Sequence, residues 1–232
     1  MLPIAILAGG IATRLRPITE KIPKALVPVA GEPFIKRQLG YLRSQGIDRA
    51  VLCVGYLGDQ IEAVVGDGRS LGMEVRYSFD GERLLGTGGA LRRALPLLGE
   101  AFFVLYGDSF LPIDFGEVEN AFHASGKPAL MTVLRNGNRW DKSNVLFVGG
   151  NLEEYNKRAP RPEMEHIDYG LSVLSAGVLA SWPSDEPFDL ADVLHALCVR
   201  GELAGVEVFR RFYEIGSHEG LAETESYFEG SK

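Results

Sequence analysis

A short apolar run that ends in adjacent glycines constrains the fold of this chain more than any other feature. Residues 2 to 7 are apolar, and the run stops at Ala8, Gly9 and Gly10. A run of this length followed by glycine predicts a buried parallel strand that enters a loop at its carboxyl end. Open α/β sheets bind ligands at that edge, and glycine lets a base or a phosphate approach backbone N–H groups.

Fixed positive charge follows this glycine pair. Arg14 comes after Thr13, and Lys24 comes after Pro23. A glycine pair alone is common in ordinary turns. The two cations are what distinguish this stretch from an ordinary turn. Together they predict a phosphate-bearing ligand at the mouth of the loop.

The stretch LAGGIATRLRPITEKIPKALVP resembles the signature of sugar-1-phosphate nucleotidyltransferases, LAGG-x-G-TRL-x-P-x-T followed by PK-x-L-x-PV-x-G-x-P. The match extends from Leu7 to Pro33. Ala12 departs from the pattern, because the family usually has a second loop glycine there, and we expect either a negative φ at Ala12 or a different loop path. The resemblance implies that the nucleotide is bound by Leu7, Ala8, Gly9, Gly10 and Thr13.

The length of 232 residues favours one α/β domain. The resemblance implies that this domain has a nucleotide-binding half (1–110) and a sugar-phosphate-binding half (111–232). A net charge of -7 argues against a broad surface for nucleic acid or anionic membrane. No apolar run reaches the roughly 18 residues that a membrane span needs, and we expect a soluble cytoplasmic protein. Cys53 and Cys198 have no metal-binding spacing and are predicted to be buried, reduced thiols.

Helical and strand patterns alternate through the first half, which predicts parallel strand pairing. Val75, Tyr77 and Phe79 alternate with polar residues, as in a strand with one face more exposed. Apolar residues around Gly149 and Gly150 predict a hairpin. The resemblance implies a Rossmann-like three-layer α/β sandwich around a mostly parallel mixed sheet, with a small antiparallel insertion on the acceptor side.

A second glycine-rich stretch, from Leu85 to Ala90, opens a predicted helix. Backbone N–H groups at a helix start suit anionic or carbonyl ligands. In the family, the similar G-T-x-G segment faces the nucleobase and ribose, which implies nucleotide binding by Gly86, Thr87 and Gly88. Asp80 and Glu82 are the nearest polar candidates for reading the base.

Two acidic residues are candidates for Mg²⁺ binding. Asp108 follows a strongly apolar strand at the ligand-binding edge of the sheet, and its position resembles that of the family's metal-binding aspartate. The segment from Phe212 to Ser217 resembles W-x-D-I-G-T, so the resemblance implies that Glu214 is the second metal ligand. Because glutamate is one methylene longer than aspartate, we expect an adjusted metal position or looser coordination.

The same resemblance identifies the part of the chain that binds the acceptor substrate, the sugar 1-phosphate. Family members commonly carry Glu-Lys-Pro where this chain has Asn156-Lys157-Arg158, which keeps the lysine and loses the glutamate. Asp168 to Leu171 resembles an Asn-x-Gly-Ile segment that lies against the sugar. The residues assigned to the sugar phosphate are Asn144, Asn156, Lys157, Asp168 and Gly170. The four histidines are scattered, and structural roles are expected for them.

The resemblance implies transfer of a nucleoside monophosphate from a nucleoside triphosphate to a sugar 1-phosphate, with release of pyrophosphate. Arg14 is assigned to the leaving pyrophosphate, Lys24 to the α-phosphoryl group and Lys157 to the sugar phosphate. The tract RWDKSNV and the compact length are most similar to heptose- or mannose-1-phosphate guanylyltransferases. N-acetylmuramate-1-phosphate uridylyltransferases and related cytidylyltransferases stay open as alternatives, and the expected role is the biosynthesis of nucleotide sugars for cell-envelope polysaccharide.

Two other classes of protein share part of this pattern. Ala12, Asn156 and Glu214 depart from the family pattern, so a catalytically silent nucleotide-sugar-binding regulator is an alternative. A glycosyltransferase would need a metal-binding Asp-x-Asp, which Asp108-Ser109-Phe110 lacks. No hexapeptide repeats follow, so we expect no C-terminal β-helix and no second activity, and a homodimer stays open.

Overall fold

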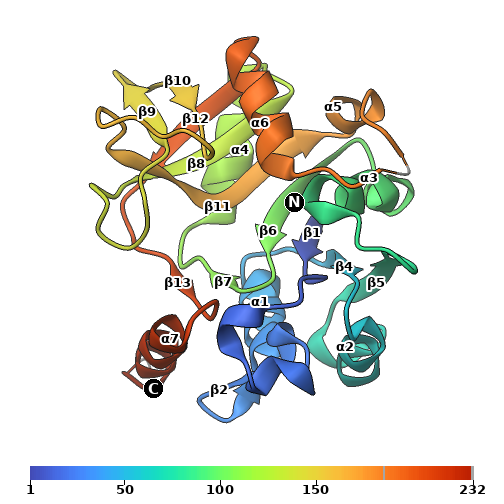
Figure 1. The fold of residues 1–232 in the computed structure, drawn as a ribbon. Helices are drawn as coiled ribbons and strands as arrows, with labels where there is room; N and C mark the ends of the chain where they lie inside the picture. Colours follow the sequence, from blue (N-terminus) through green and yellow to red (C-terminus); the bar gives the residue numbers. More distant parts are fainter. Residues whose placement is uncertain (185, 231–232) are drawn as a thin grey trace.

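Helices cover both faces of one mixed β-sheet (Figure 1) in the computed structural model, which describes residues 1–184 and 186–230. The sheet has nine strands; seven follow the order β10-β9-β11-β6-β1-β4-β5, while β8 pairs with β11 and β12 pairs with β8. The predicted three-layer α/β fold with a small antiparallel insertion is therefore confirmed.

The opening apolar run forms the central strand of the parallel half. β1 (Ile4–Leu7) pairs in parallel with β4 (Arg49–Val54) and with β6 (Ala101–Tyr106). β5 (Glu74–Phe79) extends this half beyond β4. The loops after β1, β4 and β6 consequently leave the sheet at the same edge, as the strand and glycine pattern predicted.

The other half of the sheet is mostly antiparallel. β11 (His166–Ser175) runs antiparallel to both β6 and β8 (Ala129–Arg135). β9 (Val145–Val148) and β10 (Asn151–Tyr155) form the expected hairpin. β12 (Leu203–Val208) pairs in parallel with β8.

Two apolar clusters build the core, one on each face of the sheet. Ile4 and Ile6 enter the first cluster and Ala5 enters the second, because successive residues of a strand point to opposite faces. The helices on the first face are α1 (Phe34–Ser44), α2 (Gly58–Val65) and α4 (Phe115–Ser125). Those on the second face are α3 (Gly86–Leu98), α5 (Gly177–Ala180) and α6 (Leu190–Val199).

A third, smaller cluster joins the signature stretch to the last helix, α7 (His218–Gly230). It is formed by Val27, Val29, Phe34, Phe110 and Ile215. The short segments around it are the 3₁₀ helices η1 (Thr13–Leu15), η2 (Ile18–Glu20) and η3 (Lys24–Leu26), and the strands β2 (Pro28–Val29), β3 (Glu32–Pro33), β7 (Ser109–Phe110) and β13 (Tyr213–Glu214). A further 3₁₀ helix, η4, spans Arg69–Leu71.

Two burial patterns differ from the sequence-based expectation. In β5 the polar Ser78 is buried, whereas Phe79 is 37% exposed. Phe79 lies at the end of an edge strand, where it packs against Gly58 in the first turn of α2 and beside the ring of Tyr77. Cys53 is buried as expected, but Cys198 is only half-buried. Among the described residues, no helix combines the length and apolar character that crossing a membrane requires.

Candidate active site

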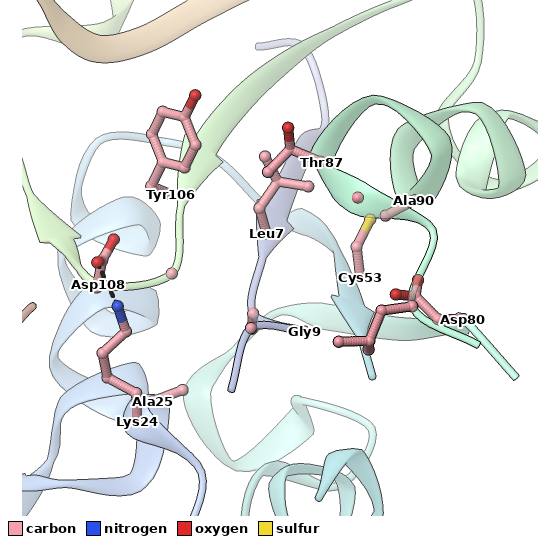
Figure 2. Close-up of a pocket in the computed structure, with 15 residues that line it drawn as sticks. Leu7, Gly9, Lys24, Ala25, Cys53, Asp80, Thr87, Ala90, Tyr106 and Asp108 are labelled. Carbon is pink, nitrogen blue, oxygen red and sulfur yellow. Dashed lines mark hydrogen bonds and ion pairs between the residues drawn. The ribbon is translucent and has the colours of Figure 1, made fainter. Parts of the chain in front are cut away.

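A cavity of about 230 Å³ opens where β1, β4 and β6 end (Figure 2). Its walls come from the first glycine loop, the start of α3 and the turn after β6. The lining residues are Leu7, Ala8, Gly9, Gly10, Lys24, Ala25, Cys53, Asp80, Leu84, Gly86, Thr87, Ala90, Tyr106, Gly107 and Asp108. Six of the eight residues assigned to the nucleotide therefore lie around one cavity, while Thr13 and Gly88 lie outside its lining.

Close packing between strand ends explains two of these glycines. A Cβ atom on Gly9 would lie 3.0 Å from the backbone nitrogen of Gly55, and one on Gly107 would lie 2.8 Å from the carbonyl oxygen of Leu7. Hydrogen bonds from Ala8 N to Cys53 O (2.8 Å) and from Gly107 N to Leu7 O (3.0 Å) hold the three ends together. Glycine is thus required at these two positions for the backbones to approach each other.

Ala12 keeps the left-handed conformation in which the family uses glycine. Its φ is 53° and its ψ is 51°, so the negative φ that we gave as one outcome is wrong. The carbonyl oxygen of Ala12 accepts hydrogen bonds from Thr19 Oγ1 at 2.7 Å and from Leu15 N at 3.2 Å. These two bonds hold a backbone conformation that an L-residue with a Cβ atom disfavours.

The second glycine loop was expected to present backbone N–H groups to a ligand, but two of these groups are occupied within the protein. The N–H groups of Gly88 and Gly89 both donate to the carbonyl oxygen of Phe188, at 3.0 and 3.4 Å, and are not free for a ligand. A Cβ atom on Gly88 would overlap the Phe188 ring, so this glycine allows α3 to pack against the segment before α6. Gly86 and Thr87 remain in the cavity wall.

Asp80 is the acidic residue at the end of the cavity away from Asp108 (Figure 2). Its side chain is 6% exposed and its Oδ2 atom accepts a hydrogen bond from Leu85 N at 3.2 Å. Burial raises the pKa of Asp80, while the Leu85 N–H group and the charge of Arg93 oppose that rise. Glu82, the other candidate for reading the base, is exposed and does not line the cavity.

Strand pairing brings the two predicted metal ligands together. β7 pairs antiparallel with β13, which places Ser109 opposite Glu214, and Ile215 N donates to Asp108 O at 2.9 Å. A Cβ atom on Gly216 would lie 2.7 Å from Glu214 Oε2 and 3.3 Å from Asp108 Oδ2. Both carboxylates thus face one small space.

The two signature cations reach the same space. Lys24 Nζ lies 2.5 Å from Asp108 Oδ2, and Arg14 Nη2 lies 3.3 Å from the position of that Gly216 Cβ atom. Burial and the neighbouring Asp108 carboxylate raise the pKa of Glu214, while Arg14 and Lys24 oppose the rise.

This donor set suits a hard divalent cation such as Mg²⁺, which prefers carboxylate oxygens. Glu214 Oε2 and Asp108 Oδ2 both lie within 3.3 Å of the position of a Gly216 Cβ atom, and a cation bound between these carboxylates would reduce their mutual repulsion. No group of three or more His, Cys, Asp or Glu side chains in residues 1–184 and 186–230 forms a closed metal site. Remaining ligands would therefore come from water or a bound phosphate, as is usual for Mg²⁺.

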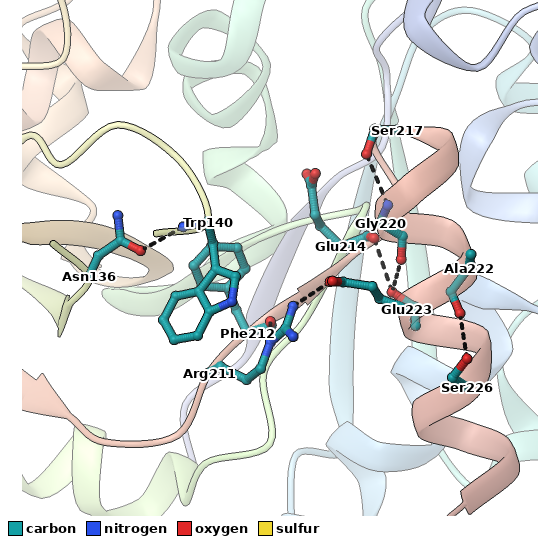
Figure 3. Close-up of polar contacts among 11 residues, drawn as sticks. Asn136, Trp140, Arg211, Phe212, Glu214, Ser217, Gly220, Ala222, Glu223 and Ser226 are labelled. Atoms are coloured by element: carbon teal, nitrogen blue, oxygen red, sulfur yellow. Dashed lines mark hydrogen bonds and ion pairs between the residues drawn. The ribbon is translucent and has the colours of Figure 1, made fainter. Parts of the chain in front are cut away.

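α7 lies beside Glu214 and contacts its backbone (Figure 3). Thr224 Oγ1 donates to the carbonyl oxygen of Glu214 at 3.0 Å. Just before β13, Arg211 pairs with Glu223 of α7 at 2.6 Å and lies over the ring of Trp140, 5.2 Å from its centroid. β13 is consequently fixed by side-chain contacts as well as by its pairing with β7.

Three of the residues assigned to the sugar phosphate gather beside Tyr106. Lys157 Nζ lies 6.0 Å from the centre of the Tyr106 ring, and a Cβ atom on Gly170 would lie 3.8 Å from that ring. Burial raises the pKa of Asp168, while a hydrogen bond from Gly170 N and the charge of Lys157 oppose the rise. Because Tyr106 also lines the cavity, this cluster adjoins it.

Asn144 and Asn156, which were also predicted to bind the sugar phosphate, instead accept hydrogen bonds from backbone N–H groups. Asn144 Oδ1 accepts a hydrogen bond from Asp168 N at 2.9 Å, and Asn156 Oδ1 accepts one from Ala159 N at 2.9 Å. Their amide oxygens are thus engaged in shaping the strand and the turn that carry Asp168 and Lys157. His195 and His166 also make internal contacts, with Tyr155 O at 2.6 Å and Glu207 Oε1 at 3.2 Å, in agreement with structural roles.

Sequence reasoning missed two residues of this region. Tyr106 lies directly before Gly107 and Asp108, which places it at the sheet edge. Asp189 caps α6 by accepting a hydrogen bond from Ala191 N, and it also accepts one from Thr87 Oγ1 at 2.7 Å. Burial opposes ionisation of Asp189, yet these hydrogen bonds and the charge of Lys157 lower its pKa overall.

A cavity at the carboxyl ends of parallel strands, with glycine in its walls and cations beside paired carboxylates, defines the class of protein that binds phosphorylated ligands at a sheet edge. The chain belongs to the nucleotidyl transferase family, whose sequence profile matches residues 4–143.

Individual relatives differ in the nucleotide that their names specify. The chain is 38% identical over 114 residues to D-glycero-alpha-D-manno-heptose 1-phosphate guanylyltransferase of Campylobacter jejuni, covering 49% of this chain and 51% of that protein. It is 29% identical to N-acetylmuramate alpha-1-phosphate uridylyltransferase of Caulobacter vibrioides, covering 95% of this chain and 94% of that protein. The chain spans about half the length of the first curated relatives it matches.

The fold has a close counterpart among solved structures. The structure of HddC from Yersinia pseudotuberculosis complexed with GMP-PN superposes with a TM-score of 0.80, covering 98% of this chain and 100% of that one. At 23% sequence identity, this likeness establishes the fold.

Replacing Ala12 by glycine is expected to stabilise the protein. The left-handed conformation costs a residue with a Cβ atom about 1–2 kcal/mol, which the Ala12→Gly variant recovers in the folded state. Glycine also makes the unfolded chain more flexible, and this offsets about half of the recovered free energy. Urea denaturation should show a net gain of about 0.5–1 kcal/mol. The matched control, Ala222→Gly on the exposed face of α7, should instead lose about 1 kcal/mol. A loss of stability in both variants would contradict this account of Ala12.

Cys53, in the cavity wall, is expected to be chemically inert. Burial and, secondarily, the nearby Asp80 raise the pKa of its thiol to about 12, so at pH 8 only about one molecule in 10⁴ carries the thiolate. Iodoacetamide at pH 8, followed by peptide mapping, should label the half-buried Cys198 at least about tenfold faster than Cys53. Equal labelling of the two cysteines would show that the cavity wall is more open than described.

Proposed function

We propose that this chain transfers a nucleoside monophosphate from a nucleoside triphosphate to a sugar 1-phosphate, yielding a nucleotide sugar and pyrophosphate. The observation that carries the proposal is the convergence of Asp108, Glu214, Lys24 and Arg14 on one small space at the mouth of the cavity. Membership of the nucleotidyl transferase family supports the same reaction class.

The main obstacle to this reaction is electrostatic, because both substrates are anions. Each pair of unit charges at ~4 Å is opposed by about 4 kcal/mol at an effective dielectric constant of ~20. In this proposal Arg14 binds the leaving pyrophosphate, and Lys24 turns from Asp108 to the α-phosphoryl group; the positions of both cations beside Asp108 support these roles. Mg²⁺ held by Asp108 and Glu214 would supply further neutralisation of the triphosphate.

No protein nucleophile or general base is required. The attacking oxygen of the sugar 1-phosphate is already ionised, so the protein's task is to align it with the α-phosphorus and to stabilise charge. The cysteine in the cavity wall is held as a neutral thiol and does not compete with this direct displacement. In this proposal Lys157 binds the sugar phosphate and Asp168 and Gly170 contact the sugar; the gathering of Lys157 and Gly170 beside Tyr106, with Asp168 near Lys157, supports these roles.

Asp80 favours guanine as the base. A buried carboxylate at the base end of the cavity can accept two hydrogen bonds from one guanine edge, which carries N1–H and the N2 amino group. Uracil offers a single N–H donor between two carbonyl oxygens, which a carboxylate repels. This supports a heptose- or mannose-1-phosphate guanylyltransferase as the specific activity.

A uridylyltransferase acting on N-acetylmuramate 1-phosphate is the second candidate. The near full-length match to the Caulobacter vibrioides protein favours it. The two candidate activities require different nucleobases, guanine or uracil, and Asp80 is the cavity residue proposed to contact the base.

A pyrophosphate-release matrix tests the proposal and separates these candidates. GTP, UTP, CTP, ATP and dTTP are each combined with heptose, mannose, N-acetylmuramate and glucose 1-phosphates in the presence of Mg²⁺. The proposal predicts release that requires both substrates, with GTP and heptose or mannose 1-phosphate as the best pair. Tight nucleotide-sugar binding without release from any pair would instead identify a silent binding protein.

Arg14→Ala should lower turnover on the order of 10²- to 10³-fold, because it removes a cation from the charge that develops in the transition state. Steady-state pyrophosphate release measures this loss. Arg16→Ala is the matched control, since Arg16 is an exposed neighbour outside the cavity lining, and it should change the rate less than about threefold. An unchanged rate of pyrophosphate release in Arg14→Ala would show that Arg14 does not stabilise the transition state.

Asp108→Asn should abolish magnesium-dependent pyrophosphate release while leaving the fold intact. The substitution keeps the shape of the side chain but removes the charge that binds the metal and pairs with Lys24. Far-UV circular dichroism serves as the folding control. A folded and fully active Asp108→Asn protein would refute the assignment of Asp108.

A further inference from the structure

A buried glutamine on α1 holds the turn that carries Asp108. The Gln38 side chain is 2% exposed. Its Nε2 atom donates two hydrogen bonds, to the carbonyl oxygens of Tyr106 at 3.0 Å and Ser109 at 2.7 Å. These two residues flank the Gly107-Asp108 pair, so one amide group joins the end of β6 to the start of β7.

Several parts of the proposed site depend on the backbone of this turn. Ser109 pairs with Glu214 across β7 and β13, and the carbonyl oxygen of Asp108 accepts a hydrogen bond from Ile215 N. Tyr106, at the other end of the turn, lines the cavity beside Lys157. A displacement of the turn would therefore change the spacing of both carboxylates and the wall of the cavity together.

The orientation of the Gln38 amide is determined by its surroundings. The reverse orientation would place Oε1 against two carbonyl oxygens, so the amino group must face them. In the observed orientation, Oε1 is buried and has no hydrogen-bond partner among the described residues. An unpaired buried oxygen destabilises the fold, so the contact with the turn is retained at a cost in stability.

We infer that Gln38 is a positioning residue, which fixes the spacing of Asp108 and Glu214 through the turn from Tyr106 to Ser109. The inference rests on the proposed function for its catalytic meaning, but the positioning itself is a property of the unliganded chain. Residues that orient metal-binding carboxylates typically change metal affinity or activity by 10- to 100-fold when they are replaced.

The test compares Gln38→Met with Leu42→Ala. Methionine has nearly the volume of glutamine but cannot donate to the two carbonyls. Leu42 lies one turn further along α1, is 1% exposed, belongs to the first apolar cluster and has no polar side-chain atom that could bond the turn, so its truncation controls for lost stability. Hydrogen exchange of the unliganded proteins is followed by mass spectrometry, and the Mg²⁺ concentration for half-maximal pyrophosphate release is measured in parallel.

Gln38→Met should exchange at least about tenfold faster in peptides covering residues 106–110 and 213–216, and its Mg²⁺ midpoint should rise roughly 10- to 100-fold. Leu42→Ala should leave both quantities unchanged although its melting temperature falls. If Gln38→Met does not fold, Gln38→His, which keeps one ring N–H donor, is measured in the same way and should show smaller shifts in the same direction.

Failure of the inference about Gln38 and failure of the proposed function give different results. If the Gln38 variant and the Leu42 variant exchange alike in those two segments, the positioning role of Gln38 is overturned, whatever the activity. If the wild-type protein releases no pyrophosphate from any substrate pair, the proposed function is overturned, while the exchange comparison still decides whether Gln38 holds the turn.

Discussion

The pairing of β7 with β13 is the interaction on which the candidate site depends. These two-residue strands bring together Asp108 and Glu214, which come from distant parts of the chain. Two carboxylates facing one small space repel each other, and the raised pKa of Glu214 reflects its burial and the neighbouring Asp108. The arrangement is tolerated because Lys24 and Arg14 face the same space and because α7 contacts the backbone of β13. A site of this kind is poised to take up a cation and a polyphosphate.

The sheet supplies the other half of the site by simple geometry. Parallel strands β1, β4 and β6 end at one edge, and glycines at those ends let the backbones approach closely enough to form a narrow cavity. The antiparallel half, added beside β6 through β11, places Lys157 and Asp168 next to Tyr106. The proposed nucleotide side and the proposed sugar-phosphate side therefore share one wall, which suits the direct transfer that we propose.

Local sequence patterns predicted much of this arrangement, and contacts between distant segments account for what they missed. The strand before Gly9 follows from a short apolar run that ends in glycine, and the position of Asp108 follows from strand and loop order. The N–H groups of Gly88 and Gly89 could not be predicted to be occupied, since Phe188 reaches them from another part of the chain. Gln38 gave no local signal either, because its partners belong to a turn after β6.

The central claim is that a divalent cation and a nucleoside triphosphate bind together between Asp108 and the cavity. Crystals grown with Mn²⁺ and a non-hydrolysable GTP analogue would test this directly through anomalous scattering at the manganese edge. The account predicts a manganese peak between the carboxylates of Asp108 and Glu214, with the triphosphate beside Arg14 and Lys24 and the base at Asp80. A manganese peak elsewhere, or a nucleotide bound outside this cavity, would contradict it.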